Sequence, residues 1–132
     1  MQNLLEIKKE NIRDEVMYQI RKAKKEILAT MDLTEELRSP LPIKYFSLLH
    51  KKYKQGVKIK RIIFGSTKQY KYLIKESEDK NLFFIGELTK SKNYKRMIMI
   101  DRTKLFFRNK TKFYFTSDSK YIKEYKKYFN TL

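Results

Sequence analysis

Tyr94, Arg96 and Asp101 place a phenol, a guanidinium and a carboxylate within one short segment of the sequence. A guanidinium can hold two phosphate oxygens at once, so Arg96 is a candidate phosphate ligand. Asp101 either pairs with Arg96 or begins the following turn, and arginine–carboxylate pairs inside a fold are often structural. The phenol of Tyr94 has an ordinary pKa near ~10, too high for a nucleophile and acid–base group at neutral pH. The three residues therefore predict phosphate binding without catalysis, and a structural role is the alternative.

Further candidate ligands lie beside this segment and at a predicted helix start. Lys95 and Arg108 add positive charge on the same stretch of chain. Ser66 is followed three residues later by Gln69, the spacing of a capping box, so a helix is expected to begin there with Lys68 in its first turn. A helix N-terminus binds anions through its free N–H groups and its dipole. Ser66 and Lys68 are therefore candidate phosphate ligands, and a plain helix cap is the alternative.

The sequence holds no other recognisable catalytic set. It has no glycine-rich phosphate loop, no nucleophile elbow and no series of spaced carboxylates for two metal ions. Cysteine is absent and His50 is the single histidine, so thiolate chemistry and the three or four ligands of a zinc site are both lacking. We therefore expect no cofactor, no metal and no enzymatic activity, unless Tyr94 replaces the missing nucleophile.

The charge balance favours a polyanionic partner. The chain carries 32 Lys and Arg against 15 Asp and Glu, a formal net charge of +17 over 132 residues. Such a field favours nucleic acid as a partner. A lysine-rich genomic composition would produce the same count without any binding function, and the sequence leaves both explanations open.

Length and hydrophobicity predict one globular domain over residues 1–132. Hydrophobic residues make up 41% of the chain, which is enough for a packed core. No apolar run approaches the ~18 residues of a membrane helix, and no signal peptide is recognisable. Together with the absence of cysteine, these features lead us to expect a cytoplasmic protein that binds no membrane.

The elements that must position the candidate ligands form an alternating pattern. Three short strands are expected within 93–119, at 96–100, 105–107 and 113–115, separated by polar turns. Earlier strands are expected at 26–31, 57–64 and 82–85, and helices at about 2–26, 42–55, 66 onward and after 117–119. Two prolines interrupt 32–42, which predicts a loop there. This order indicates an α/β fold, a mixed β-sheet flanked by helices on both faces.

The segment from Tyr94 to Asp101 resembles the signature of the phospholipase D superfamily, His-x-Lys followed after four residues by Asp. The histidine position falls on Tyr94, the lysine position on Arg96 and the aspartate position on Asp101. The Gly-Ser and Asn that follow in that family are absent around 108–111. In element order the chain resembles one half of a phospholipase D fold and is similar to the effector domains of archaeal TrmB-type regulators. The resemblance implies a degenerate site and a homodimer.

Three functions are consistent with these observations. The main prediction is a catalytically inactive phospholipase-D-like domain that binds nucleic acid or another phosphate-bearing partner through basic residues. The first alternative is an effector-sensing or dimerisation domain of a TrmB-like transcription regulator, favoured because no helix-turn-helix is recognisable. The second alternative is a phosphodiesterase or nuclease in which Tyr94 is the nucleophile.

Overall fold

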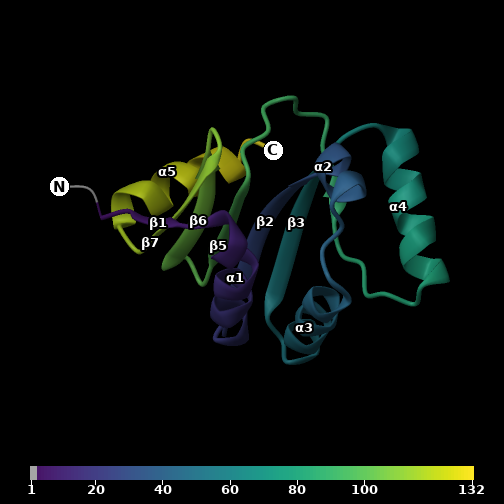
Figure 1. Cartoon of the computed structure of the whole chain (residues 1–132), viewed down its shortest axis with the longest axis horizontal. Coiled ribbons are helices and arrows are strands. Elements are labelled where there is room, and N and C mark those ends of the chain that lie inside the picture. Colours follow the sequence, from purple (N-terminus) through teal and green to yellow (C-terminus); the bar gives the residue numbers. More distant parts are fainter. Residues whose placement is uncertain (1–2) are drawn as a thin grey trace.

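Over residues 3–132, the part of the chain that the computed structural model describes, seven strands form one mixed sheet (Figure 1). Their order is β1-β7-β6-β5-β2-β3-β4, so β5 (Met97–Ile100) lies at the centre. Strand β2 (Glu26–Asp32) runs parallel to β3 (Lys58–Phe64) and antiparallel to β5. The other strands are β1 (Leu5–Ile7), β4 (Glu87–Leu88), β6 (Lys104–Asn109) and β7 (Lys112–Thr116). The predicted α/β class with a mixed sheet is confirmed.

Helices cover both faces of this sheet. Helices α1 (Ile12–Arg21) and α3 (Ile43–Lys54) bury Met17, Ile20, Tyr45 and Leu49 in a cluster on one face. Helix α5 (Ser119–Phe129) packs on the opposite face, the one that carries Met99 and Phe107 (Figure 1). The remaining helices, α2 (Leu33–Arg38) and α4 (Thr67–Asp79), contribute Leu33, Tyr70 and Leu73 to a third cluster beside β3, and the short 3-10 helix η1 (Lys9–Asn11) precedes α1.

The strand directions bring distant segments to the same end of the sheet. Because β2 and β3 are parallel, both finish at one end, where α2 and α4 begin. Because β5 is antiparallel to β2, the residues that precede β5 arrive at this same end, which we call the α2 end. The starts of β2 and β3 and the turn between β5 and β6 gather at the opposite end (Figure 1).

Two predictions near the N-terminus are wrong. The helix expected over 2–26 is shorter, because Leu5–Ile7 pair with β7 as an edge strand before α1 begins at Ile12. The first residue of the expected helix, at position 2, lies outside the described part of the chain. The loop expected over 32–42 contains α2, since Asp32 caps a helix that ends before the two prolines: its side chain accepts a hydrogen bond from the Glu35 N–H at 3.1 Å.

The strand expected at 82–85 is also wrong. This segment forms no strand, and pairing with β3 begins only at β4. Backbone carbonyls at the end of this segment accept hydrogen bonds from side chains instead of from a neighbouring strand. Arg61 donates to the Ile85 carbonyl at 3.3 Å, and the Tyr70 hydroxyl donates to the Gly86 carbonyl at 3.1 Å. Phe83 packs flat on His50, with ring centroids 4.6 Å apart, which gives the single histidine a packing role.

Candidate functional site

The centre of the α2 end is a carboxylate that the sequence reasoning missed. Glu35 of α2 accepts hydrogen bonds from the Tyr94 hydroxyl at 2.9 Å, from Arg96 at 3.3 Å and from Arg108 at 2.5 Å. Its two oxygens are divided between the donors, because Tyr94 and Arg96 contact Oε1 and Arg108 contacts Oε2. We call these four residues the Glu35 cluster. Two guanidiniums against one carboxylate leave the cluster with a formal charge of +1.

Side chains from β2 and α5 hold the segment that carries Tyr94 and Arg96. The hydroxyl of Tyr128 donates to the Asn93 carbonyl at 2.7 Å and accepts from the Lys95 N–H at 2.8 Å. Thr30 of β2 donates to the Lys95 carbonyl at 2.6 Å and accepts from the Met97 N–H at 3.0 Å. The backbone on both sides of Arg96 is therefore fixed before β5 begins, which preorganises the cluster.

The antiparallel pairing of β5 and β6 places Arg108 beside Arg96. The Arg108 N–H donates to the Arg96 carbonyl at 3.1 Å. The Arg108 guanidinium carbon lies 5.9 Å from the centre of the Tyr94 ring, which in turn packs on Phe64 of β3 at 5.1 Å. Both guanidiniums are half-buried and share the Glu35 carboxylate. They therefore lose part of their hydration, which strengthens their contacts with an anion.

The protonation states argue against a Tyr94 nucleophile. Burial is the largest influence on Tyr94 and raises the pKa of its phenol well above the ordinary value; the nearby Glu35 carboxylate raises it further. Burial also pushes the pKa of Glu35 upward, but the hydrogen bonds from Arg108 and Tyr94 and the charges of both arginines outweigh it and lower that pKa. At neutral pH the phenol is therefore a protonated donor to an ionised carboxylate.

Asp101 lies away from this cluster. The four residues of β5 separate it from Arg96, and its carboxylate accepts the backbone N–H groups of Lys24 at 2.9 Å, Lys25 at 2.7 Å and Glu26 at 3.0 Å. Although burial opposes it, these hydrogen bonds keep the pKa of Asp101 below its ordinary value. The structure therefore does not bring Asp101 to Tyr94 and Arg96, because a strand holds residues five positions apart at its two ends.

The remaining predicted ligands occupy the α2 end in different ways. Lys95 is exposed, with its ammonium 5.1 Å from the centre of the Tyr128 ring. Ser66 forms the predicted capping box with Gln69, and Gln69 also donates to Thr34 of α2 at 3.2 Å. Lys68 is exposed in the first turn of α4. The Ser66 hydroxyl is thus engaged as a cap, and phosphate binding by any of these residues stays a prediction.

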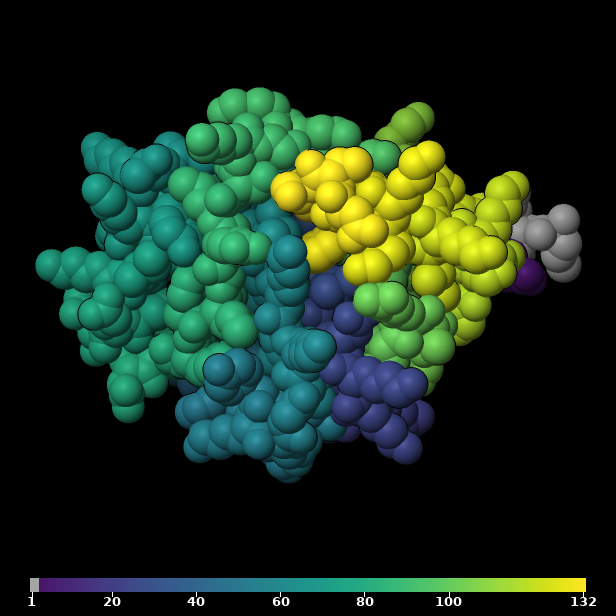
Figure 2. All heavy atoms as spheres, turned by 180° about the vertical axis from the view of Figure 1, so that it is seen from behind, coloured from purple at the N-terminus to yellow at the C-terminus, as the bar shows by residue number. Residues whose placement is uncertain are grey.

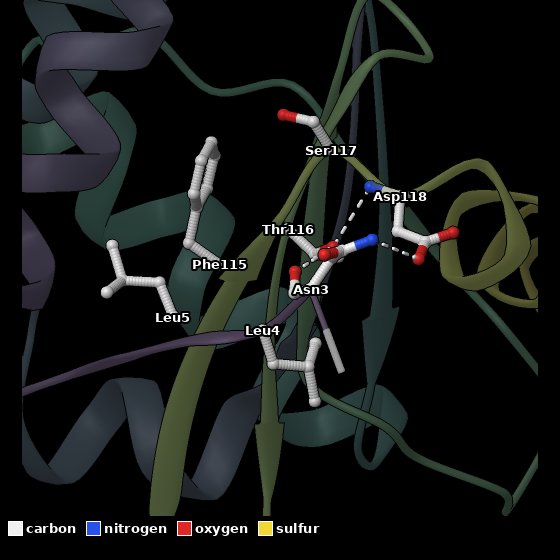
Figure 3. A pocket seen from close by; sticks show the side chains of 7 residues that line it. All are labelled: Asn3, Leu4, Leu5, Phe115, Thr116, Ser117 and Asp118. Atoms are coloured by element: carbon white, nitrogen blue, oxygen red, sulfur yellow. Dashed lines mark hydrogen bonds between the residues drawn. The ribbon is translucent and has the colours of Figure 1, made fainter. Parts of the chain in front are cut away.

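The polar residues that line a depression beside the N-terminal strand have a structural role (Figure 3). Thr116 donates to the Asn3 carbonyl at 2.7 Å and accepts from the Asp118 N–H at 3.0 Å, while the Asn3 amide donates to Asp118 at 3.1 Å. Asp118 also caps α5 through the Lys120 N–H. These bonds tie the N-terminal segment to the start of α5, which explains the polar groups in this depression without a ligand.

Comparison with known proteins supports a fold relationship. No family model matches the chain, and no curated protein matches it significantly. Among solved structures, the chain is similar to TrmBL2, an archaeal chromatin protein whose structure shows a novel mode of DNA binding. The TM-score is 0.68 at 17% sequence identity, over 98% of this chain and 51% of TrmBL2. At this identity the similarity shows the fold alone, and the chain spans about half the length of TrmBL2. These comparisons give no support for membership in the phospholipase D superfamily, which stays a prediction.

Residues 3–132 show neither a metal-binding group of side chains nor a membrane-spanning helix. No group of three or more His, Cys, Asp and Glu side chains there lies close enough to hold a metal ion. No helix in this part of the chain is both long enough and apolar enough to cross a membrane.

The sequence did contain a signal for Glu35. Asp32 ends a strand and is followed three residues later by Glu35, the spacing of a helix N-cap and its partner position. This signal predicts α2. It does not show that Arg96 and Arg108, which are distant in sequence, converge on the Glu35 carboxylate.

Proposed function

We propose that this chain is the effector-sensing or dimerisation domain of a TrmB-like transcription regulator, a single domain over residues 1–132. The observation that carries this proposal is the similarity to TrmBL2 over 98% of the chain but only 51% of TrmBL2. A domain matching half of a DNA-binding protein is expected to work beside a separate DNA-binding module. Among residues 3–132, α2 and α3 are the only α-helices that follow each other directly, and strands of the one sheet precede and follow them, so this part of the chain shows no separate helical DNA-binding unit.

The Glu35 cluster supports a non-catalytic role. A phenol that donates to an ionised carboxylate is not available as a nucleophile, and both arginines already have an anionic partner. Arg96 and Glu35 keep 39% and 32% of their side-chain surface exposed, so an anionic effector has access to the pair. Such an effector would compete with Glu35 for the two guanidiniums. The competition would couple ligand binding to the position of α2.

The test of this proposal is dimerisation. The domain is fused to a helix-turn-helix unit that lacks its own dimerisation element, and binding to a two-half-site operator is measured together with the mass of the unfused chain by analytical ultracentrifugation. The proposal is supported if the unfused chain is a dimer in solution and if the fusion binds the operator but the helix-turn-helix unit by itself does not. The proposal is contradicted if the unfused chain stays monomeric at high concentration and the fusion does not bind the operator.

A second candidate function, direct nucleic-acid binding by a phospholipase-D-like domain, is favoured by the net charge of +17. In that case the phosphate ligands would be Tyr94, Lys95, Arg96 and Arg108, with Ser66 and Lys68 nearby. The pairing of Arg96 and Arg108 with Glu35 argues against this location, because the carboxylate already offsets half of their charge within the fold. Neutralisation of Lys95 and Lys68 without any effect on DNA binding would rule the α2 end out as the binding surface.

A further inference from the structure

Nearly half of the net charge gathers at the end of the sheet opposite α2. Three segments meet there: 21–26 between α1 and β2, 51–58 between α3 and β3, and the β5–β6 turn at 101–104. They contain ten basic residues against two acidic ones, a net +8 of the chain's +17. We call the ten residues the basic end: Arg21, Lys22, Lys24, Lys25, Lys51, Lys52, Lys54, Lys58, Arg102 and Lys104. The ends of α1 and α3 and the β5–β6 turn lie side by side in Figure 2.

Hydrogen bonds across the three segments fix this arrangement. The Lys58 N–H donates to the Lys25 carbonyl at 2.9 Å. Lys52 is buried, and its ammonium donates to the carbonyls of Arg21 at 2.5 Å and Ala23 at 3.1 Å at the end of α1. Asp101 binds the amides of 24–26, as described above. The basic end is therefore a rigid surface built from parts of the chain that are far apart in sequence.

The two local carboxylates do not neutralise the surface. Glu26 pairs with Arg102 at 2.6 Å, and Asp101 is used by backbone amides. Within residues 3–132, no carboxylate lies within 4.0 Å of the seven exposed cations Arg21, Lys22, Lys24, Lys25, Lys51, Lys54 and Lys58. Like charges that lie within the screening distance, about 8 Å at physiological salt, repel one another. An external polyanion would relieve that repulsion.

The helix dipoles explain only part of this cluster. Cations in the last turns of α1 and α3 interact favourably with the negative ends of the two helices. That account covers Arg21, Lys51, Lys52 and Lys54. It does not cover Lys24 and Lys25 in the loop or Lys58 at the start of β3, which the fold does not require to be charged.

The composition of the surface selects the class of polyanion. Exposed tyrosines lie on the two helices that end here: Tyr18 is 49% exposed with the Lys22 ammonium 4.3 Å from its ring centre, and Tyr53 is 52% exposed. The exposed aliphatic side chains Leu5, Leu37 and Ile43 belong to β1, α2 and the start of α3. A membrane surface would favour aliphatic groups for insertion beside the lysines, whereas lysine interleaved with tyrosine suits phosphates and bases.

We infer that the basic end binds the phosphate backbone of a nucleic acid, on a surface separate from the Glu35 cluster. The inference stands on the charge distribution and is independent of the proposed dimerisation. A depression between the three segments, lined among others by Arg21, Lys24 and Lys104, gives the backbone a concave seat. The phosphate chemistry is shared by DNA and RNA, so the test includes both.

The test compares two triple variants of equal net charge. The first is Lys24→Gln, Lys25→Gln and Lys58→Gln, which keeps the backbone amides that bind Asp101. The control is Lys120→Gln, Lys123→Gln and Lys127→Gln on the exposed side of α5. Affinity for a labelled random-sequence DNA duplex and for a single-stranded RNA is measured from about 50 to about 200 mM salt. Circular dichroism verifies that both variants fold.

The slope of log affinity against log salt is negative. We expect its magnitude to fall by about 3 in the first variant, one unit for each lysine removed, and by less than about 1 in the control. The stronger of the two wild-type affinities identifies DNA or RNA. Equal losses in both variants, or salt-independent binding, overturn the inference. Binding to anionic vesicles with no binding to either nucleic acid assigns the surface to a membrane and also overturns it. The oligomeric state of the protein in solution should be unchanged in the first variant. A failure of nucleic-acid binding is therefore distinguishable from a failure of the proposed dimerisation.

Discussion

Arg96 and Asp101 lie at opposite ends of β5, with the buried residues of that strand between them. The guanidinium of Arg96 contacts the α2 end, whereas the carboxylate of Asp101 organises the start of β2. The sequence spacing that resembles a phosphate-handling motif therefore serves two separate polar sites. One central strand joins the Glu35 cluster at one end to the strongly basic surface at the other.

Asp101→Asn is expected to destabilise the fold by about 1–2 kcal/mol, because three backbone N–H groups lose a charged acceptor. Asparagine tolerates the left-handed backbone of this residue, where φ is 55°, so the change tests the charge and not the turn. Urea unfolding at neutral pH measures the effect. Asp79→Asn at the end of α4 is the control, and equal stability of the two variants would show that Asp101 merely occupies the turn.

Glu35→Gln is expected to destabilise the protein at neutral pH and to have a smaller effect in acid. The pKa of Glu35 is lower folded than its ordinary value of 4.5, so its contribution is complete above that value and disappears as pH falls through the folded pKa. Since the cluster is partly exposed, we expect about 1 kcal/mol at pH 7. Urea unfolding at several pH values, with Glu78→Gln on α4 as the control, measures it. A stability difference that persists unchanged at about pH 2 would contradict the assignment.

Tyr94→Phe is expected to cost about 0.5–1.5 kcal/mol of stability through the lost hydrogen bond to Glu35, and to change no catalytic rate. The wild-type protein is expected not to hydrolyse a phosphodiester such as bis(p-nitrophenyl) phosphate without metal, because the phenol is held protonated. Measurable wild-type hydrolysis that disappears in the variant would instead identify Tyr94 as a nucleophile.

Gly65→Ala is expected to destabilise the protein more than Gly56→Ala. A Cβ at Gly65 would lie 2.8 Å from Leu33 Cδ1 and 2.9 Å from Leu33 Cβ, so α2 would have to move. A Cβ at Gly56 meets no atom within 4 Å, and only its φ of +92° opposes the change. We expect about 2–3 kcal/mol at Gly65 and about 1 kcal/mol at Gly56. Thermal unfolding compares them, and equal costs would show that the contact with Leu33 is easily relieved.

The local pattern of the sequence determined several elements. The apolar runs of β2, β3 and β5, the capping box at Ser66 and the Asp118 cap of α5 form as expected, because each depends on neighbours in the chain. The mixed α/β class also follows from this pattern.

Only the tertiary structure decided which side chains meet. The convergence of Arg96 and Arg108 on Glu35 depends on the pairing of β5 with β6 and on the direction of β2, and neither leaves a trace in local spacing. Residues 5–7 became a strand because β7 offered a free edge, which overrode the helical pattern. The basic end arises in the same way, since three segments with ordinary charge runs become one surface only when parallel strands begin side by side.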